Sequence, residues 1–192
     1  MSNYLSVGFV YSKMNKEEEL NSIMKLIREK SWELSSLKYS EDSKGNKWTE
    51  LNNNITDFDV SDAFFNKFFS IRSFCKSVDE SKTMNFALTY EELSKDNFGF
   101  LIQIDASQVY KFGNVESLKK TEIDIIELVE CLYKVSKYSY VFSDDEAEIE
   151  YTVEQINSET DFKYSILILP KDENSVEIKM APWTLDGLTT RK

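Results

Sequence analysis

The segment Asn97-Phe-Gly-Phe-Leu-Ile-Gln-Ile-Asp105 decides the fold of this chain. Side chains alternate between the two faces of a strand, so the large apolar residues at even positions from Phe98 to Ile104 would share one face. Residues 4–12 repeat this pattern, with Leu5, Val7 and Phe9 on one face. We therefore predict two strands that turn an apolar face towards a core.

An amphipathic helix is expected after each of these strands. Asn15 and Glu18 resemble a capping box, and an apolar stripe over residues 20–27 predicts a helix that ends near Lys30. Thr121 and Asp124 resemble the start of a second helix, with apolar positions between residues 125 and 132. Further strands are predicted at 32–37, 47–55 and 138–143. The order strand, helix, strand, strand then occurs twice, which a duplication or a coincidence would explain equally well.

Residues 59–78, between the two halves, are rich in aromatic side chains. Phe64, Phe68, Ile71 and Cys75 lie on one helical stripe, which predicts a third, aromatic-rich helix. Core packing is the favoured interpretation of this stripe. The alternative is an exposed aromatic anchor for a partner, because aromatic residues often dominate binding hot spots.

The remaining segments predict an α+β fold. Strands are expected at 84–91, 164–170 and 176–180, and residues 164–170 are apolar on both faces, as in a central strand that is covered on both sides. No Pro-rich linker or low-complexity sequence divides the chain. We predict a single domain over residues 1–192 with a mostly antiparallel sheet, a mixed sheet being the alternative. Residues 181–192 would form a C-terminal tail, in which Trp183 and Leu185 could pack against the body.

The charge balance limits the classes of partner. The 192 residues include 23 Lys and Arg against 34 Asp and Glu, a formal net charge of −11. This balance disfavours binding to nucleic acid or anionic membranes and favours salt-sensitive association with a basic protein. Solubility alone explains the acidity equally well. We expect a cytoplasmic protein, because the sequence shows no secretory signal and no apolar run long enough to span a bilayer.

The sequence argues against most enzyme mechanisms. Histidine is absent, and five glycines form no phosphate-binding motif. Cys75 and Cys131 are too few and too far apart for a metal cluster or a disulfide scaffold, so we expect both to be reduced. We therefore predict no catalytic residue, no cofactor and no metal ligand. A carboxylate-dependent enzyme without histidine remains the alternative.

The segment Ser143-Asp-Asp-Glu-Ala-Glu-Ile-Glu-Tyr-Thr-Val153 is the candidate binding site. As a strand, it would place apolar residues on one face and a row of carboxylates on the other, which a fold does not need because like charges repel. We predict that this row binds a cationic partner, with apolar anchors beside it. An acidic face with no partner is the alternative. The predicted partner-binding residues are Asp144, Glu146, Glu148 and Glu150, with Tyr140 and Trp183 as anchors.

Three segments together resemble immunity proteins of bacterial polymorphic toxin systems. They are Phe98–Asp105, Tyr140-Val-Phe-Ser-Asp-Asp-Glu-Ala-Glu-Ile-Glu-Tyr151 and Tyr164-Ser-Ile-Leu-Ile, so the likeness mainly covers residues 98–170. The resemblance implies a protein without enzymatic activity that binds a cognate toxin, often a nuclease, in the cytoplasm and blocks its active site or substrate surface. The acidic row would then face basic residues of the toxin. A housekeeping interaction domain is the alternative, and the oligomeric state stays open.

Overall fold

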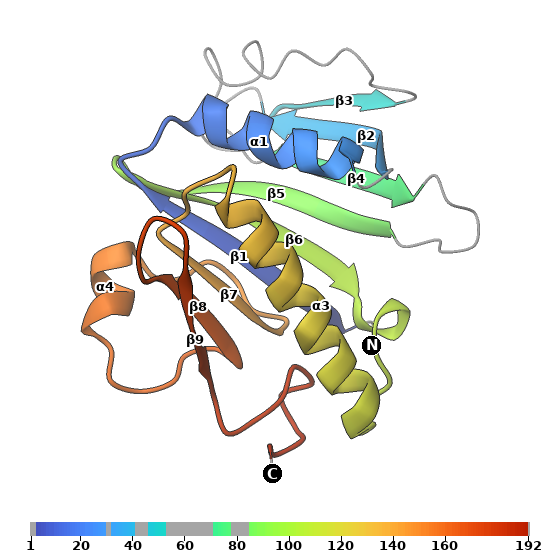
Figure 1. Cartoon of the computed structure of the whole chain (residues 1–192). Helices are drawn as coiled ribbons and strands as arrows, with labels where there is room; N and C mark the ends of the chain where they lie inside the picture. The colour runs from blue at the N-terminus through green and yellow to red at the C-terminus, as the bar shows by residue number, and fades with distance from the viewer. Residues whose placement is uncertain (1–2, 30–31, 41–45, 53–70, 78–84, 192) are drawn as a thin grey trace.

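The computed structural model describes residues 3–29, 32–40, 46–52, 71–77 and 85–191 (Figure 1). The helices are α1 (Lys16–Glu29), α3 (Val115–Tyr133) and α4 (Val153–Ser158), with a short 3-10 helix at Ala106–Gln108. The strands are β1 (Tyr4–Ser12), β2 (Trp32–Ser40), β3 (Trp48–Asn52), β4 (Ile71–Ser77), β5 (Asn85–Ser94), β6 (Asn97–Asp105), β7 (Tyr140–Asp145), β8 (Ile166–Pro170) and β9 (Val176–Met180).

These strands form one sheet in the order β3-β2-β4-β5-β6-β1-β7-β8-β9. Each ladder in the described part of the chain is antiparallel. The N-terminal strand β1 lies inside the sheet, paired along its whole length with β6 and on its other side with β7. The predicted α+β single-domain fold with a mostly antiparallel sheet is confirmed.

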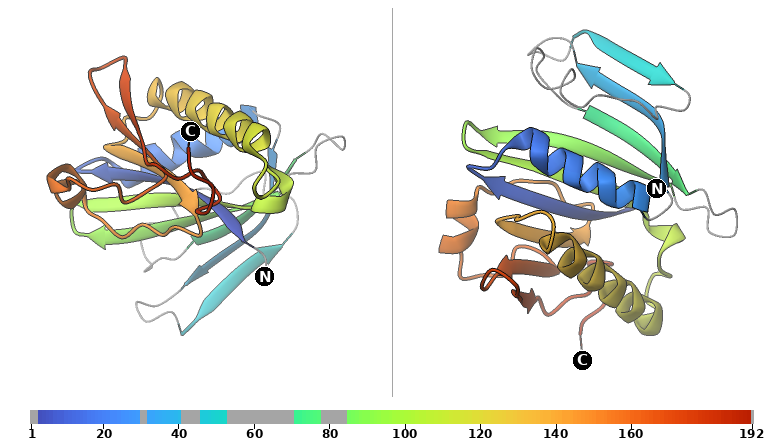
Figure 2. Two further views of the ribbon diagram at one scale, coloured as in Figure 1. Left: turned by 90° about the horizontal axis from the view of Figure 1, so that it is seen from below. Right: turned by 45° about the horizontal axis from the view of Figure 1, so that its top comes forward.

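Helices α1 and α3 are both crossover connections. The chain leaves β1, passes through α1 and enters β2 four positions away in the sheet; it leaves β6, passes through α3 and enters β7 on the far side of β1. β6 and β7 are each antiparallel to β1 and therefore parallel to one another, and such a connection needs the length of a helix. Figures 1 and 2 show both helices on the same face of the sheet.

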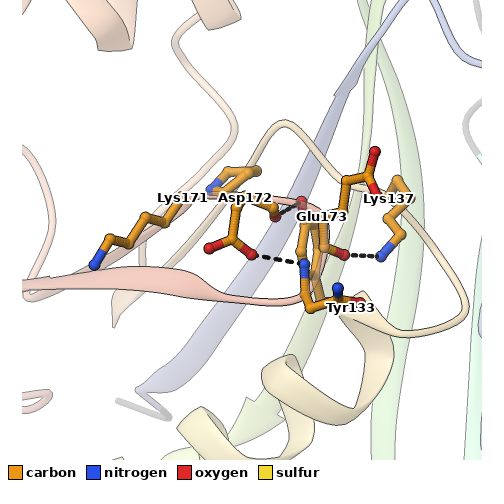
Figure 3. Close-up of a pocket in the computed structure, with 7 residues that line it drawn as sticks. Tyr133, Lys137, Lys171, Asp172 and Glu173 are labelled. Carbon is orange, nitrogen blue, oxygen red and sulfur yellow. Dashed lines mark hydrogen bonds between the residues drawn. The ribbon is translucent and has the colours of Figure 1, made fainter.

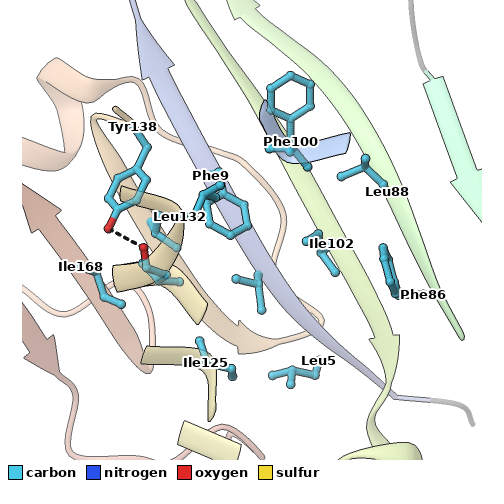
Figure 4. Close-up of a cluster of buried hydrophobic side chains, with 14 of the residues drawn as sticks. Leu5, Phe9, Phe86, Leu88, Phe100, Ile102, Ile125, Leu132, Tyr138 and Ile168 are labelled. Carbon is cyan, nitrogen blue, oxygen red and sulfur yellow. Dashed lines mark hydrogen bonds between the residues drawn. The ribbon is translucent and has the colours of Figure 1, made fainter. Parts of the chain in front are cut away.

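The main core fills the space between these helices and the sheet (Figure 4). Leu5, Val7, Phe9 and Tyr11 of β1 supply its centre, as the alternation predicted. Both helices add apolar side chains to it, from residues 20–24 of α1 and residues 118–133 of α3. Their amphipathic pattern was therefore a correct guide to which face is buried.

The start of α3 differs from the prediction. The helix begins at Val115, six residues before Thr121, because the Asn114 side chain accepts a hydrogen bond from the Ser117 amide (2.9 Å) and caps it. The Thr121 hydroxyl instead donates to backbone carbonyls of Val109 and Ser117. An apolar stripe locates a helix better than it locates its first residue.

A second, smaller core lies on the opposite face of the sheet, and two glycines make room for it. A Cβ atom at Gly8 would lie 2.1 Å from the ring of Phe142, its cross-strand partner on β7. A Cβ atom at Gly99 of β6 would lie 2.6 Å from Cδ1 of Ile149. Phe142 in turn stacks on Tyr164 at a ring-centroid distance of 4.0 Å. Close packing on this face therefore requires strand positions without side chains.

Two predictions about secondary structure are wrong in part: the aromatic-rich helix and the repeated order of elements. Ile71 and Cys75 belong to strand β4, paired with β2 and β5, and not to an aromatic-rich helix. The backbone of this segment pairs with a strand on each side, which the spacing of its apolar residues could not reveal. Phe64 and Phe68 lie outside the described residues. The repeated order also fails in the second half, where α4 follows β7, although the first half has the predicted order.

The packing over Gly99 predicts a specific stability effect. Gly99→Ala should lower the free energy of unfolding by about 1–3 kcal/mol, because overpacking forces neighbouring atoms to move. The added Cβ would also lie 2.9 Å from the Phe9 carbonyl oxygen. Urea denaturation of Gly99→Ala, Ile149→Val and the double variant measures the coupling. The double variant should be more stable than the sum of the two single effects predicts; strictly additive effects would contradict close packing of Ile149 over Gly99.

Candidate functional site

The acidic segment is extended, but most of it is not a strand. β7 ends at Asp145, and Glu146 adopts a left-handed backbone conformation (φ 50°) while its amide donates to the Tyr4 carbonyl (2.8 Å). Residues 146–152, named here the acidic strap, then pair with no strand among the described residues. The prediction of a continuous strand over 143–153 is therefore wrong, because the left-handed residue turns the chain out of the ladder.

The alternation of side chains nevertheless persists along the acidic strap. Ile149 is buried, and Ala147 and Tyr151 pack against the second core, whereas Glu146, Glu148 and Glu150 are exposed. Tyrosine hydroxyls beneath the strap replace ladder hydrogen bonds: Tyr140 donates to the Tyr151 carbonyl (2.6 Å) and Tyr164 to the Glu148 carbonyl (3.3 Å). The strap is thus held from below by its backbone and its apolar side chains.

The helix α4 anchors the end of the acidic strap. Thr152 and Gln155 form a reciprocal capping box at its N-terminus, and Ile156 is buried in the second core. The Val153 amide also donates to the Asn97 side chain (3.4 Å). Both ends of the strap are therefore fixed to the sheet, which orients its exposed carboxylates.

Tyr140 does not serve as an exposed anchor, contrary to the prediction. Its side chain is fully buried between the sheet and the strap, where burial raises the pKa of its hydroxyl. The alternating pattern placed Tyr140 beside the acidic residues, but β7 lies between β1 and β8, and the strap covers this part of its face. Tyr140 is a structural support of the strap.

Asp144 is also committed within the molecule. Its carboxylate accepts hydrogen bonds from the Ser165 amide (2.8 Å), the Trp183 indole (3.2 Å) and the Asp145 amide (2.8 Å). Burial raises its pKa, while these bonds and Arg191 act in the opposite direction. The prediction that Asp144 belongs to a free acidic row is therefore wrong, since its acceptor atoms already have partners.

Trp183 joins the C-terminal segment to β7 through the hydrogen bond from its indole to Asp144, and its side chain remains partly exposed. Its ring meets the exposed ring of Phe162 edge-on, with the centroids 6.5 Å apart. The sequence did not single out Phe162. An apolar pair therefore lies next to Asp144, although its members differ from the predicted Tyr140 and Trp183.

The predicted C-terminal tail is folded onto the body. Leu185 is fully buried, and the Asp186 carboxylate accepts hydrogen bonds from Thr184, Leu188, Thr189 and Gly113. Burial raises the pKa of Asp186, but the bonds from Thr189, Leu188 and Thr184 outweigh it and lower the pKa. Arg191 pairs with the buried Glu122 of α3 (2.7 Å) and donates to the carbonyls of Ser165, Ala181 and Trp183. The Asp-Gly dipeptide at 186–187 was the one available signal of an ordered turn here.

The acidic strap presents three exposed carboxylates. No ion pair joins Glu146, Glu148 or Glu150 to another described residue. Glu91 of β5 adds to the same field: its cross-strand partner is Gly99, over which the strap passes. Burial and the nearby Glu148 raise the pKa of Glu91. Three carboxylates on the strap and one on the sheet therefore form an uncompensated negative surface.

A surface pocket of about 640 Å³ lies between the end of α3 and the β8–β9 turn (Figure 3). The Asp172 carboxylate there accepts bonds from Asn174 and Ser175, and Lys137 donates to the Glu173 carbonyl (2.7 Å). These groups stabilise the turn. No cluster of acidic or cysteine side chains within the described parts could hold a metal ion.

Comparison with known proteins shows the family of this chain. A family model described as Immunity protein 64 matches residues 1–191. The chain belongs to this family. The match confirms the predicted resemblance to immunity proteins, extends it from residues 98–170 to nearly the whole chain, and supports an immunity-type role at the level of the family.

Other comparisons add little information about this immunity protein. A Pseudomonas aeruginosa T6SS protein is similar to 74% of this chain over 40% of its own length, with 9% sequence identity and a TM-score of 0.36. That likeness is too weak to carry an argument. The search among curated proteins found no significant match. Among the described residues, no helix has the length and apolarity needed to cross a membrane.

The acidic residues at the end of β7 predict a pH effect on stability. Burial and the neighbouring carboxylates of Glu146, Asp144 and Asp186 raise the pKa of Asp145 to about 6. Because this value exceeds that of an unfolded aspartate, near 4, the contribution of Asp145 is fully present below about pH 4 and lost as the pH rises through 6. Asp145→Asn should therefore stabilise the protein by about 1–2 kcal/mol at pH 7, after allowance for solvent screening.

Urea denaturation of Asp145→Asn and the unaltered protein at pH 4.5 and pH 7 provides the measurement. The difference between the two proteins isolates Asp145 from other groups, such as Asp186, whose lowered pKa acts in the opposite direction. An equal difference at both pH values would show that the Asp145 carboxyl does not titrate in this range.

Proposed function

We propose that this immunity protein neutralises a cognate toxin by stoichiometric binding, with the acidic strap against basic residues of the toxin. The proposal rests on one observation above all: Glu146, Glu148 and Glu150 are exposed, without ion pairs among the described residues, on a segment fixed at both ends. A fixed set of carboxylates can pair with Arg and Lys side chains without first losing much backbone entropy.

The acidic strap would act mainly on the rate of association. Each exposed ion pair contributes only about 0–1 kcal/mol, so three carboxylates do not account for tight binding. Their shared field attracts a basic partner over a distance and raises the association rate. Phe162 and Trp183, next to Asp144, supply apolar surface that a tight complex would also bury.

A toxin that acts on nucleic acid suits this surface by its chemistry. Such a protein holds phosphate groups with Lys and Arg side chains, which the strap carboxylates would occupy. Occlusion of this kind needs no catalytic group and no turnover in the immunity protein. It would take place in the cytoplasm, where nucleic acid is accessible to the toxin.

The charge of the strap predicts the kinetics of this complex. The triple variant Glu146→Lys, Glu148→Lys, Glu150→Lys should slow association with the cognate toxin by tenfold or more and flatten its dependence on salt. Stopped-flow or surface plasmon resonance at 50–500 mM NaCl provides the measurement, and survival of toxin-expressing cells provides the functional readout. The melting temperature should change by less than about 5 °C, since the altered side chains are exposed.

A matched control carries the same charge change on another surface. Asp124, Glu127 and Glu130 are exposed on α3, which covers the opposite face of the sheet, so their replacement by Lys leaves the strap intact. This control should retain most of the association rate and full protection. Equal losses in both triple variants would attribute binding to net charge alone and contradict a role for the strap.

A further inference from the structure

Strand β9 is an open edge of the sheet. It pairs with β8 on one side, and no described strand pairs with its other side. Glu177, Ile178, Lys179 and Met180 are all exposed. An exposed edge strand is a template for another strand, because its outward amide and carbonyl groups have no ladder partner.

The ladder with β8 fixes which backbone groups point outward. The Ala181 amide donates to the Ser165 carbonyl (2.9 Å), so this pair is hydrogen-bonded. Hydrogen-bonded pairs alternate in an antiparallel ladder, so Lys179 and Glu177 also turn their backbone groups towards β8. Val176, Ile178 and Met180 therefore turn theirs outward.

The side chains of β9 divide in the same way. Ile178 and Met180 pair with Ile168 and Ile166, which belong to the main core, so the apolar side chains of β9 lie on the helix-bearing face. Glu177 and Lys179 lie on the opposite face, where Lys179 lines a pocket with α4 and the loop that follows it. The edge thus has an apolar face and a face with one charge of each sign.

We propose that β9 pairs with β9 of a second copy of this chain, antiparallel and centred on Ile178, so that two sheets become one. In this register Ile178 lies opposite its own counterpart, and Val176 lies opposite Met180. These are the residues with outward backbone groups, so each pair exchanges two hydrogen bonds. The two-fold symmetry makes every contact occur twice.

Charge complementarity favours a second copy as the occupant. The same register places Glu177 of each chain opposite Lys179 of the other, in the pairs that are not hydrogen-bonded and where side chains approach most closely. A shift by two residues loses this match. The five residues of β9 therefore fit themselves in one register, with both backbone and side-chain partners satisfied.

The expected association is weak. Five residues on each side bury less than the roughly 1,200 Å² of a stable interface, so we expect a dissociation constant on the order of 0.1 mM. The net charge of −11 on each chain opposes dimerisation at low salt, so the dimer should be more stable at 300 mM than at 20 mM NaCl. The surface is separate from the acidic strap and goes beyond the proposed function.

Analytical ultracentrifugation of the full chain from 10 µM to 1 mM tests the proposal. The average mass should rise from 22.4 kDa towards twice that value. Glu177→Lys places Lys opposite Lys, and Lys179→Glu places Glu opposite Glu, so each should weaken dimerisation about tenfold or more. The double variant Glu177→Lys, Lys179→Glu should restore it to within about threefold, and so should an equimolar mixture of the two single variants.

Two further measurements identify the surface. Glu173→Lys and Lys171→Glu make the same charge changes in the adjoining turn and should leave dimerisation unchanged. Amide exchange at Val176, Ile178 and Met180 should slow at high protein concentration, while exchange at Glu177 and Lys179 stays the same. A monomer at 1 mM in 300 mM NaCl, or a dimer that Glu177→Lys does not weaken, would overturn the proposal.

Discussion

The burial of β1 on both faces is the constraint on which the rest of this structure depends. β1 lies inside a nine-stranded sheet, so its odd-numbered and even-numbered side chains both need cover. Two crossover helices cover one face. On the other face, Phe142 fills the space over Gly8 and Ile149 fills the space over Gly99. The acidic strap is therefore first a structural element, which completes the cover of the central strands.

The strap covers the sheet on one side and faces solvent on the other, and this explains its composition. A segment that lies on a sheet without joining it must bury apolar side chains below and satisfy its backbone by other means. Ile149 is the apolar side chain that the strap buries, and the hydroxyl groups of Tyr140 and Tyr164 donate hydrogen bonds to its backbone carbonyls. The side chains of Glu146, Glu148 and Glu150 above are exposed and have no ion-pair partner among the described residues. A charged surface held in this way can change without loss of the core, because the two sets of side chains point in opposite directions.

The sequence was a good guide to faces and a poor guide to neighbours. Alternation correctly assigned the buried side of β1 and β6 and the exposed position of Glu146, Glu148 and Glu150. It could not show that Glu146 turns the chain out of the ladder, because hydrophobic period is the same for a paired strand and for an extended strap. It also could not show that Asp144 bonds to Trp183, 39 residues away, or that Tyr140 lies beneath the strap. Such contacts depend on strand order, which short-range patterns do not encode.

Repulsion between the carboxylates of the negative surface destabilises the unbound protein. Glu91 lies half-buried at the edge of the strap, where burial and Glu148 raise its pKa. A cationic group bound between Glu91 and Glu148 would offset the repulsion between the two carboxylates and lower the pKa of Glu91. Binding would therefore favour the charged form of Glu91. Free energy spent on like-charge repulsion in the unbound state is then recovered in the complex. A neutral or acidic partner would not relieve this repulsion. The unpaired carboxylates of the surface therefore select basic partners.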